Sequence, residues 1–264
     1  MATDGLKALV KRISPWPDVH LGVWTGAVGL PGQIWVEEDK NGLWLGRILR
    51  SPVGEGGEFC GRLLRPAAEA DLQSQKEAGA QAAALKSQAQ AKAKALDLAL
   101  KFQAAEMDLN RTFLRLYFTV QTRTDLRPFL REFSAEAKVR VELRQLGPRD
   151  EARILGFLGP CGRPLCCRTF LMHMRPIPLE FAFEQQLFLH PERRSGVCGR
   201  LKCCLAYERD FYLQALQGLP EPGDRIEING RKGKILAHNV FSRTTQVEWS
   251  DGTRADLPWE ELGA

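Results

Sequence analysis

The spacing of apolar and polar residues predicts a small β module at the start of the chain. Two apolar runs, residues 34–36 and 43–49, flank the sequence Asp39-Lys40-Asn41-Gly42. Asn-Gly tolerates positive φ at both turn positions and therefore favours a tight hairpin between the two runs. A third run, residues 62–65, adds another strand. We assign residues 1–66 to this N-terminal β module.

The next stretch has the composition and the period of a long helix. Residues 67–109 contain no proline and a single glycine, Gly79, and residues 78–100 are mostly Ala, Gln, Lys and Leu, which are strong helix formers. Apolar residues recur at helical spacing on one face: Leu85, Ala89, Leu96, Leu100 and Met107. The pattern predicts one helix over residues 67–109. It serves either as a solvated spacer with a narrow packing stripe or as a coiled-coil arm for a partner helix.

Two changes of period follow between residues 113 and 155. Residues 113–119 are typical of a strand, and residues 124–136 carry apolar side chains at helical spacing. Val139, Val141 and Leu143 then alternate with charged residues, as in a half-buried strand. A short helix is expected after Gly147-Pro148. These elements predict a β-α-β core, which leads directly into a cysteine-rich segment.

The last part of the chain returns to strand patterns. A short helix is expected over residues 206–216, and residues 224–228, 234–236 and 245–249 are typical of short strands separated by turns. We predict an SH3-like or KOW-like small β barrel over residues 219–264, after a cysteine-rich α/β core over residues 110–218. The expected fold class is therefore α+β.

Composition permits buried cores and gives no sign of export. The 264 residues are 44% hydrophobic, and 37 basic against 32 acidic residues leave a net charge of +5. Such a small excess allows nucleic-acid binding without indicating it. The N-terminus lacks a basic segment followed by an apolar one, and no apolar run approaches the ~20 residues of a membrane-spanning helix. We expect a cytoplasmic protein, where structural disulfides are rare.

Six of the seven cysteines lie in two phrases with the same spacing. Residues 161–167 read Cys-Gly-Arg-Pro-Leu-Cys-Cys, and residues 198–204 read Cys-Gly-Arg-Leu-Lys-Cys-Cys. The candidate metal ligands are Cys161, Cys166, Cys167, Cys198, Cys203 and Cys204. The seventh cysteine, Cys60, has no spaced companion and is interpreted as incidental.

Several features of the phrases favour thiolates over thiols. Gly162 and Gly199 free the backbone to wrap around one centre, and Pro164 favours a helical turn that begins near the adjacent cysteines. A helix N-terminus and the neighbouring Arg163 and Arg200 both stabilise negative charge on sulfur. The two arginines are expected to donate hydrogen bonds from outside the ligand set.

The spacing leaves more than one chemistry open. Zinc takes four ligands, and an adjacent Cys-Cys pair suits its tetrahedral geometry poorly because neighbouring side chains diverge. An iron–sulfur cubane has corners several ångströms apart and a negative charge that flanking arginines would stabilise, so it is favoured. Zinc, a thiol–disulfide sensor and ordinary buried cysteines are the alternatives.

The number of thiols bears on the assembly. Six thiolates exceed the four that one cubane takes and fall short of the eight that two would need. Either one cluster is bound with two cysteines left over, or two clusters each lack a ligand that another chain provides. The second arrangement predicts a partner with its own cysteines.

A longer set of residues resembles the YaaT/RicT family, whose members carry a PSP1 C-terminal domain. The resemblance covers about residues 33–218 and rests on the two cysteine phrases and on residues 142–152, Glu-Leu-Arg-Gln-Leu-Gly-Pro-Arg-Asp-Glu-Ala. It implies a cytoplasmic, non-catalytic protein, with membrane association through a partner. It also implies a complex with RicA- and RicF-like helical proteins that carries two [4Fe-4S] clusters and allows flavin as a further cofactor.

The resemblance further implies a role in RNA metabolism. Family complexes are linked to endoribonuclease Y, to mRNA processing and decay, and in spore formers to sporulation, competence and biofilm development. We therefore expect an iron–sulfur adaptor subunit, with RNA contacted through the complex. The rival hypotheses are a zinc-stabilised RNA- or ribosome-binding protein and a thiol-based oxidoreductase. No nucleophile–base pair, P-loop or dinucleotide fingerprint indicates an enzyme.

Overall fold

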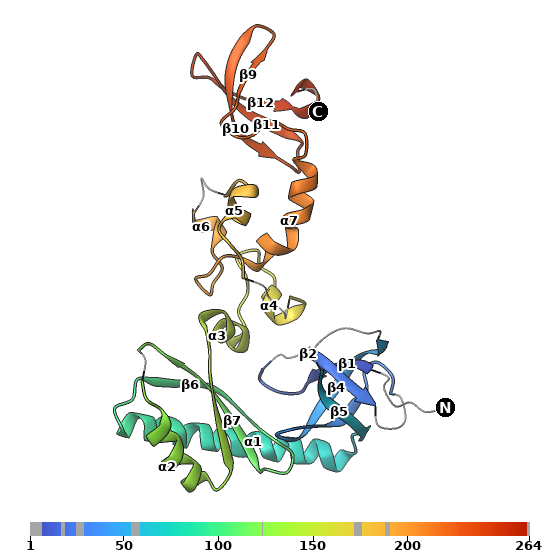
Figure 1. Cartoon of the computed structure of the whole chain (residues 1–264), viewed down its shortest axis with the longest axis vertical. Helices are drawn as coiled ribbons and strands as arrows, with labels where there is room; N and C mark the ends of the chain where they lie inside the picture. Colours follow the sequence, from blue (N-terminus) through green and yellow to red (C-terminus); the bar gives the residue numbers. More distant parts are fainter. Residues whose placement is uncertain are drawn as a thin grey trace. The chain divides into compact units, whose positions relative to one another are not determined.

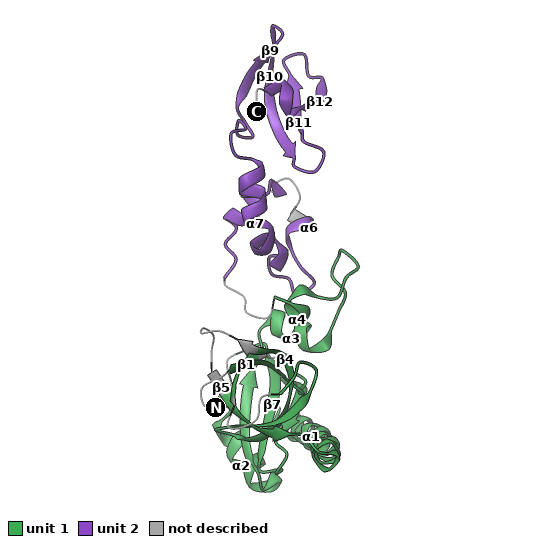
Figure 2. Cartoon of the chain, turned by 90° about the vertical axis from the view of Figure 1, so that its right-hand side faces the viewer, with its two compact units in different colours: residues 1–172 green, residues 173–264 purple. Residues whose placement is uncertain are grey.

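Helices and separate sheets alternate along the chain, which confirms the α+β class. A computed structural model describes residues 7–16, 19–24, 29–53, 59–122, 124–171, 176–187 and 191–262. They fall into two compact units, residues 1–172 and 173–264, which Figure 2 colours separately. Each unit has its own sheet structure and is described by itself.

Unit 1 begins with a closed five-stranded barrel in the order β1-β2-β5-β3-β4. Its strands are β1 (Lys7–Arg12), β2 (Val19–Trp24), β3 (Ile34–Asp39), β4 (Gly42–Val53) and β5 (Phe59–Pro66). Its interior holds Ala8, Val10, Trp35, Ile48 and Leu63. The structure confirms the expected hairpin, because β3 and β4 pair antiparallel up to Asp39 and Gly42. The turn itself is Lys40-Asn41, and only Gly42 of the Asn-Gly pair has a positive φ, so the predicted turn positions were wrong. Gly42 has φ +142°, a conformation that side-chain-bearing residues rarely adopt.

The long helix is shorter than predicted. Helix α1 (Glu69–Ala95) ends near Asp97, which has φ +51°, and strand β6 (Leu100–Met107) follows. The prediction for residues 96–109 was wrong because Leu100 and Met107 fit a helical period, although both are buried from a strand. The coiled-coil interpretation is also corrected. The buried stripe of α1 packs against this unit's own sheet: Ala78, Ala82, Leu85, Ala89 and Ala93.

The predicted β-α-β core is present. Strand β7 (Phe113–Val120), helix α2 (Arg127–Ala137) and strand β8 (Arg140–Gln145) follow one another, and β7 and β8 pair parallel. With β6 they form a three-stranded sheet in the order β6-β7-β8. Helices α1 and α2 cover one face of this sheet, and Phe129 and Phe133 of α2 are fully buried there (Figure 1).

The expected helix after Gly147-Pro148 is α3 (Pro148–Leu155), on the opposite face of the sheet. Its Ile154 packs with Trp16 and Tyr117, whose rings stack with centroids 5.6 Å apart. Trp16 thereby connects the segment after β1 to the sheet and to α3. A short helix, α4 (Cys166–Thr169), completes the described part of unit 1.

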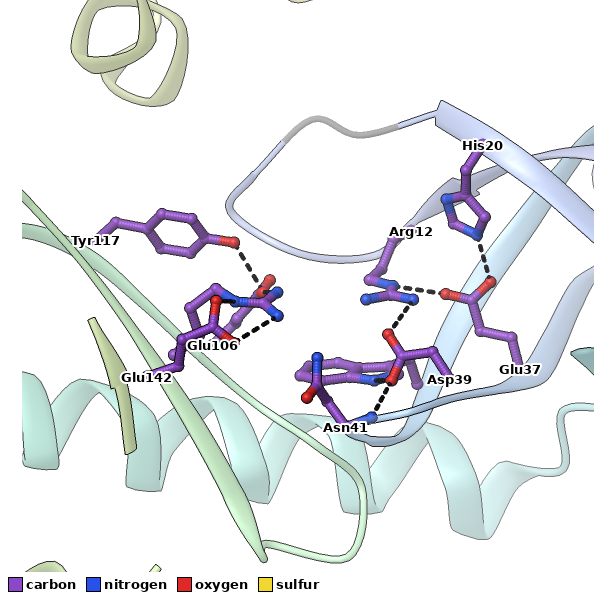
Figure 3. Close-up of polar contacts among 10 residues, drawn as sticks. Arg12, His20, Glu37, Asp39, Asn41, Glu106, Tyr117 and Glu142 are labelled. Carbon is purple, nitrogen blue, oxygen red and sulfur yellow. Dashed lines mark hydrogen bonds and ion pairs between the residues drawn. The ribbon is translucent and has the colours of Figure 1, made fainter. Parts of the chain in front are cut away.

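Buried charges face each other between the barrel and the sheet. On the barrel side, Glu37 accepts hydrogen bonds from Arg12 Nε at 2.6 Å and pairs with His20 Nε2 at 2.8 Å. On the sheet side, Glu106 accepts from Arg115 Nη1 at 2.6 Å and from the Tyr117 hydroxyl at 2.7 Å (Figure 3). Burial would lower the pKa of Arg12, but the nearby carboxylates, Glu106 among them, raise it above its ordinary value.

The Glu37 carboxylate is expected to make the stability of unit 1 sensitive to acid. Burial would raise the pKa of Glu37, but the His20 hydrogen bond and the Arg12 charge outweigh it and hold the pKa below 4.5. The resulting stability is present above pH ~4.5 and is lost as the pH falls through the lowered folded-state pKa. Glu37→Gln removes one of the two carboxylates that pair with the buried Arg12 guanidinium and is expected to cost about 3 kcal/mol at neutral pH.

Urea unfolding at a series of pH values measures both effects. Glu38→Gln is the matched control, because Glu38 is the next residue of β3 and is exposed. It is expected to change the free energy of unfolding by less than about 0.5 kcal/mol. Equal stability losses in the two variants would contradict the assignment of Glu37 as a buried anchor.

Unit 2 contains short helices followed by a sheet. The helices are α5 (Glu180–Glu184), α6 (Pro191–Arg194) and α7 (Cys203–Ala215). The strands are β9 (Arg225–Ile228), β10 (Arg231–Asn239), β11 (Thr244–Trp249) and β12 (Arg254–Pro258), followed by a 3₁₀ turn at Trp259–Leu262. They form a four-stranded antiparallel sheet in the order β12-β11-β10-β9. The structure thus shows the predicted strands but does not confirm an SH3-like or KOW-like barrel.

Among the described residues, no helix combines the length and the apolar character that crossing a membrane requires.

Candidate metal centre

The first cysteine phrase forms a tight hairpin turn in unit 1. The Gly162 amide donates to the Gly159 carbonyl at 2.9 Å, and the Gly159 amide donates to the Arg163 carbonyl at 2.8 Å. A β-turn followed by a residue with positive φ is a common three-residue hairpin loop. Leu158 and Pro164 form the single bridge below it. Cys161 therefore lies at the apex of the turn.

The second phrase repeats this turn in unit 2 with the same hydrogen bonds. The Gly199 amide donates to the Gly196 carbonyl at 2.9 Å, and the Gly196 amide donates to the Arg200 carbonyl at 2.8 Å. An antiparallel bridge again closes the base, here between Ser195 and Leu201. The repeat seen in the sequence is therefore a repeat of backbone structure.

The apical sulfur has the same position in both turns. A Cβ added at Gly159 would lie 3.4 Å from the Cys161 Sγ, and one added at Gly196 would lie 3.6 Å from the Cys198 Sγ. In each turn the thiol thus folds back over the glycine two residues earlier. We call these two segments, residues 159–163 and 196–200, the cysteine turns.

Each cysteine turn leads into a helix that starts with the adjacent cysteine pair. Cys166 and Cys167 are the first two residues of α4, and Cys203 and Cys204 are the first two residues of α7. The predicted placement of Cys166 and Cys167 at a helix start is confirmed, whereas α7 begins three residues before the helix expected over residues 206–216. The sequence suggested that Pro164 would form part of the first helical turn. In the structure it lies before the helix, in the bridge below the cysteine turn.

The cysteines differ in exposure. Cys161 is exposed, Cys167 is buried, and Cys166, Cys198, Cys203 and Cys204 are intermediate; all six are free of disulfides. Arg163 and Arg200 are exposed at the ends of the cysteine turns, beside Gly162 and Gly199. The Cys60 side chain lies outside the described residues.

Within the part of the chain that the structure describes, no group of three or more His, Cys, Asp or Glu side chains is arranged to hold a metal ion. The structure therefore brings the sulfurs of one phrase onto one turn and one helix start, in each unit separately. The complete ligand set and the hydrogen-bonding role of Arg163 and Arg200 stay predictions.

Sequence reasoning missed the residues that fix the two helix starts. Arg168 of α4 donates to the Ile154 carbonyl at 3.3 Å and crosses Gly156, where an added Cβ would overlap its guanidinium. In unit 2, Gln185 donates to the Leu205 carbonyl at 2.6 Å, and Glu184 pairs with Arg209 at 2.7 Å. These partners are far apart in sequence, so no local motif reveals them.

Two family descriptions match the chain. The PSP1 C-terminal conserved region matches residues 61–146, and the third domain of PSP1-like proteins matches residues 176–219. The first range covers most of β5, α1 and the β6-β7-β8 sheet with α2. The second range contains the second cysteine turn and all of α7. Fold and cysteine turns thus define a PSP1-type α+β protein.

A curated relative narrows this class. The chain is 38% identical to the Stage 0 sporulation protein YaaT of Bacillus subtilis (strain 168) over 202 residues, which cover 76% of this chain and 74% of the relative. No solved structure matches the chain. The chain belongs to the YaaT/RicT family of PSP1-domain proteins, as the sequence resemblance predicted.

The positive φ of the two turn glycines leads to a graded prediction. Gly162 and Gly199 have φ +73° and +71°, and an added Cβ would meet no atom within 4 Å at either position. Backbone strain is therefore the main cost of a side chain here. Ala is expected to destabilise each turn by about 1–2 kcal/mol, Asn by less and Val by more.

Amide hydrogen exchange of the peptides that contain Gly159 or Gly196 measures the opening of each turn. Gly79→Ala in α1 is the control, because Gly79 is helical with open space around it and alanine favours a helix. Equal exchange for the Asn, Ala and Val variants would contradict the strain argument.

Proposed function

We propose that this chain is a non-catalytic iron–sulfur adaptor subunit of a cytoplasmic complex that modulates endoribonuclease Y-dependent mRNA processing and decay. The observation that carries the proposal is the repeated cysteine turn, with the same hydrogen bonds and the same cysteine pair at the following helix start. Membership of the YaaT/RicT family supports the cellular role.

The donor set fits an iron–sulfur cluster. Each unit offers an apical thiol from a turn and two thiols from a helix start, and exposed arginines lie beside each turn. Thiolates are the usual ligands of [4Fe-4S] clusters, and hydrogen bonds to sulfur tune them. Such a cluster, when bound, supplies iron–thiolate cross-links and one-electron chemistry.

The protein's own contribution is to hold these thiols in defined positions. In unit 1 the buried position of Cys167 limits its access to water, while Cys161 stays exposed at the turn apex. Arg163 and Arg200 are free to orient toward negative charge because they lie on the surface. The helix start favours the thiolate forms of the adjacent pair.

The division of the chain into two units assigns an equal number of candidate ligands to each unit. Cys161, Cys166 and Cys167 lie in unit 1, and Cys198, Cys203 and Cys204 lie in unit 2. Each unit thus presents three of the four thiolates that one cubane takes. This supports two clusters whose remaining ligands come from partner chains, here RicA- and RicF-like helical proteins.

Metal analysis of anaerobically purified protein, alone and with its partners, tests the cofactor. We expect iron and acid-labile sulfide in the wild-type complex and a lower content of both in Cys161→Ser and in Cys198→Ser, because each removes the apical thiol of one turn. Loss of about half the iron in each single variant is expected if the clusters are independent. Cys60→Ser is the matched control and should retain full iron content.

Other metal contents would decide against this cofactor. Stoichiometric zinc without sulfide would favour the zinc-stabilised RNA- or ribosome-binding alternative. Protein free of iron, sulfide and zinc, or serine variants that keep the metal, would remove the basis for the cluster proposal.

Co-purification from the native host tests the adaptor role. A tagged wild-type chain is expected to retain two small helical proteins and endoribonuclease Y, and Cys198→Ser is expected to lose the helical proteins because the shared cluster no longer forms. Mapping of transcript ends in a strain that lacks the chain should show the same unprocessed transcripts as a strain that lacks the nuclease. Unchanged transcript ends would rule out the role in RNA processing.

A further inference from the structure

Strand β8 forms one edge of the β6-β7-β8 sheet in unit 1, and Figure 1 shows it as the strand that leads from α2 to α3. In the described part of this unit, β7 pairs with one side of β8 and α2 packs over its apolar face. A groove of about 560 Å³ is lined by Leu126 just before α2, by Leu130 of α2 and by Val141 and Leu143 of β8. In the described part of unit 1, no strand pairs with the other side of β8.

The backbone groups of β8 alternate in direction along the strand. The amides of Arg140 and Leu146 donate to the Thr112 and Phe118 carbonyls at 2.9 and 2.8 Å, on the β7 side. The N–H and C=O of one strand residue point to the same side, and successive residues point to opposite sides. Three residues consequently direct these groups to the open edge: Val141, Leu143 and Gln145.

The strand is self-complementary when two copies pair antiparallel. With Leu143 opposite Leu143 of a second copy, Val141 lies opposite Gln145, and these outward-pointing residues exchange pairs of hydrogen bonds. Glu142 then lies opposite Arg144 on both sides of the symmetry axis. These are the non-hydrogen-bonded positions, where opposing side chains approach most closely.

Charge disfavours the neighbouring registers. The direction of the hydrogen bonds permits only shifts that move the pairing by two positions, because other shifts place outward groups opposite inward ones. One such shift sets Glu142 opposite Glu142 and Arg140 opposite Arg144, and the other sets Arg144 opposite Arg144. Like charges directly opposite each other destabilise a strand pair.

Contacts within the chain already hold both charged side chains on the face opposite α2. The Arg115 Nε lies 3.0 Å from Glu142 Oε1, and the Arg144 guanidinium lies 4.5 Å from the centre of the Trp16 ring. The Glu142 side chain is nevertheless 42% exposed, and Arg144 is exposed. Both are thus positioned to meet a second copy with little further loss of side-chain entropy.

We propose that this chain forms a symmetric homodimer in which the β8 strands of two copies pair antiparallel, centred on Leu143. The two three-stranded sheets then become one continuous sheet, with Glu142 of each copy paired to Arg144 of the other. The dimer does not depend on metal binding at the cysteine turns. The dimer proposal and the cluster proposal are therefore tested independently.

Charge reversal in the full chain tests the dimer by analytical ultracentrifugation over a concentration series. The wild-type chain should dimerise with increasing concentration. Glu142→Arg and Arg144→Glu each place like charges opposite one another at both symmetric positions. Each variant should raise the dimer dissociation constant at least about tenfold. The double variant again places opposite charges opposite one another, with the two positions exchanged. Its dimer dissociation constant should return to within a few-fold of the wild-type value.

Two further variants separate pairing from folding. Lys76→Glu changes an exposed charge on α1 and should leave dimerisation unchanged. Gln145→Pro removes an amide that points away from β7, and it should weaken dimerisation without lowering the melting temperature appreciably. Glu142→Arg also removes the contact between Glu142 and Arg115, which lowers the melting temperature. The double variant should therefore keep this low melting temperature although its dimerisation is restored.

A wild-type chain that remains monomeric into the high micromolar range overturns the proposal. It is equally overturned if the double variant dimerises as weakly as the single variants, or if Gln145→Pro dimerises like wild type. These outcomes would leave β8 an edge that other copies of the chain do not use.

Discussion

The positive φ at Gly162 and Gly199 is the constraint on which both cysteine turns depend. A residue in this conformation lets the chain reverse within a few residues, so that the preceding cysteine lies at the apex and the next two begin a helix. The hydrogen bonds across Gly159 and Gly196 then hold the turn without help from other elements. Because the geometry is local, the same solution appears in both units.

Local geometry alone does not orient the helices that follow the turns. In unit 1, Arg168 crosses Gly156 to reach α3, and in unit 2, Gln185 and the Glu184–Arg209 pair hold α7 against α5. Polar contacts thus anchor each cysteine pair to a helix of its own unit. Such anchors are directional, whereas an apolar contact of the same size would permit sliding.

The parts of the fold predicted from the sequence are those set by neighbouring residues. The polar stretch between residues 36 and 43 marks a hairpin, and the change of period around Thr124 marks the β-α-β core. Strand β6 escaped prediction for two physical reasons. A bulge between Phe102 and Ala104 interrupts its alternation, and its inward positions include the charged Glu106.

The buried charges of unit 1 could not be predicted for a related reason. Glu37 is fully buried, and its partner Arg12 lies 25 residues earlier in the chain. Neither residue differs in local pattern from an exposed charge such as Glu38. Only closure of the barrel brings the partners together, so burial of the charge is a consequence of the tertiary fold.

The cluster proposal and the dimer proposal have one feature in common: in each, a single chain lacks groups that another chain would supply. In the cluster proposal, three cysteines in each unit would leave a cubane one ligand short, and strand β8 has a row of amides and carbonyls without a neighbouring strand in the described part of unit 1. The cysteine turns and strand β8 require different partners. The cysteine turns require a further sulfur donor, and strand β8 requires an extended backbone with complementary charges. A cysteine-bearing partner satisfies the first need and a second copy of β8 satisfies the second, so the two associations do not compete for the same groups.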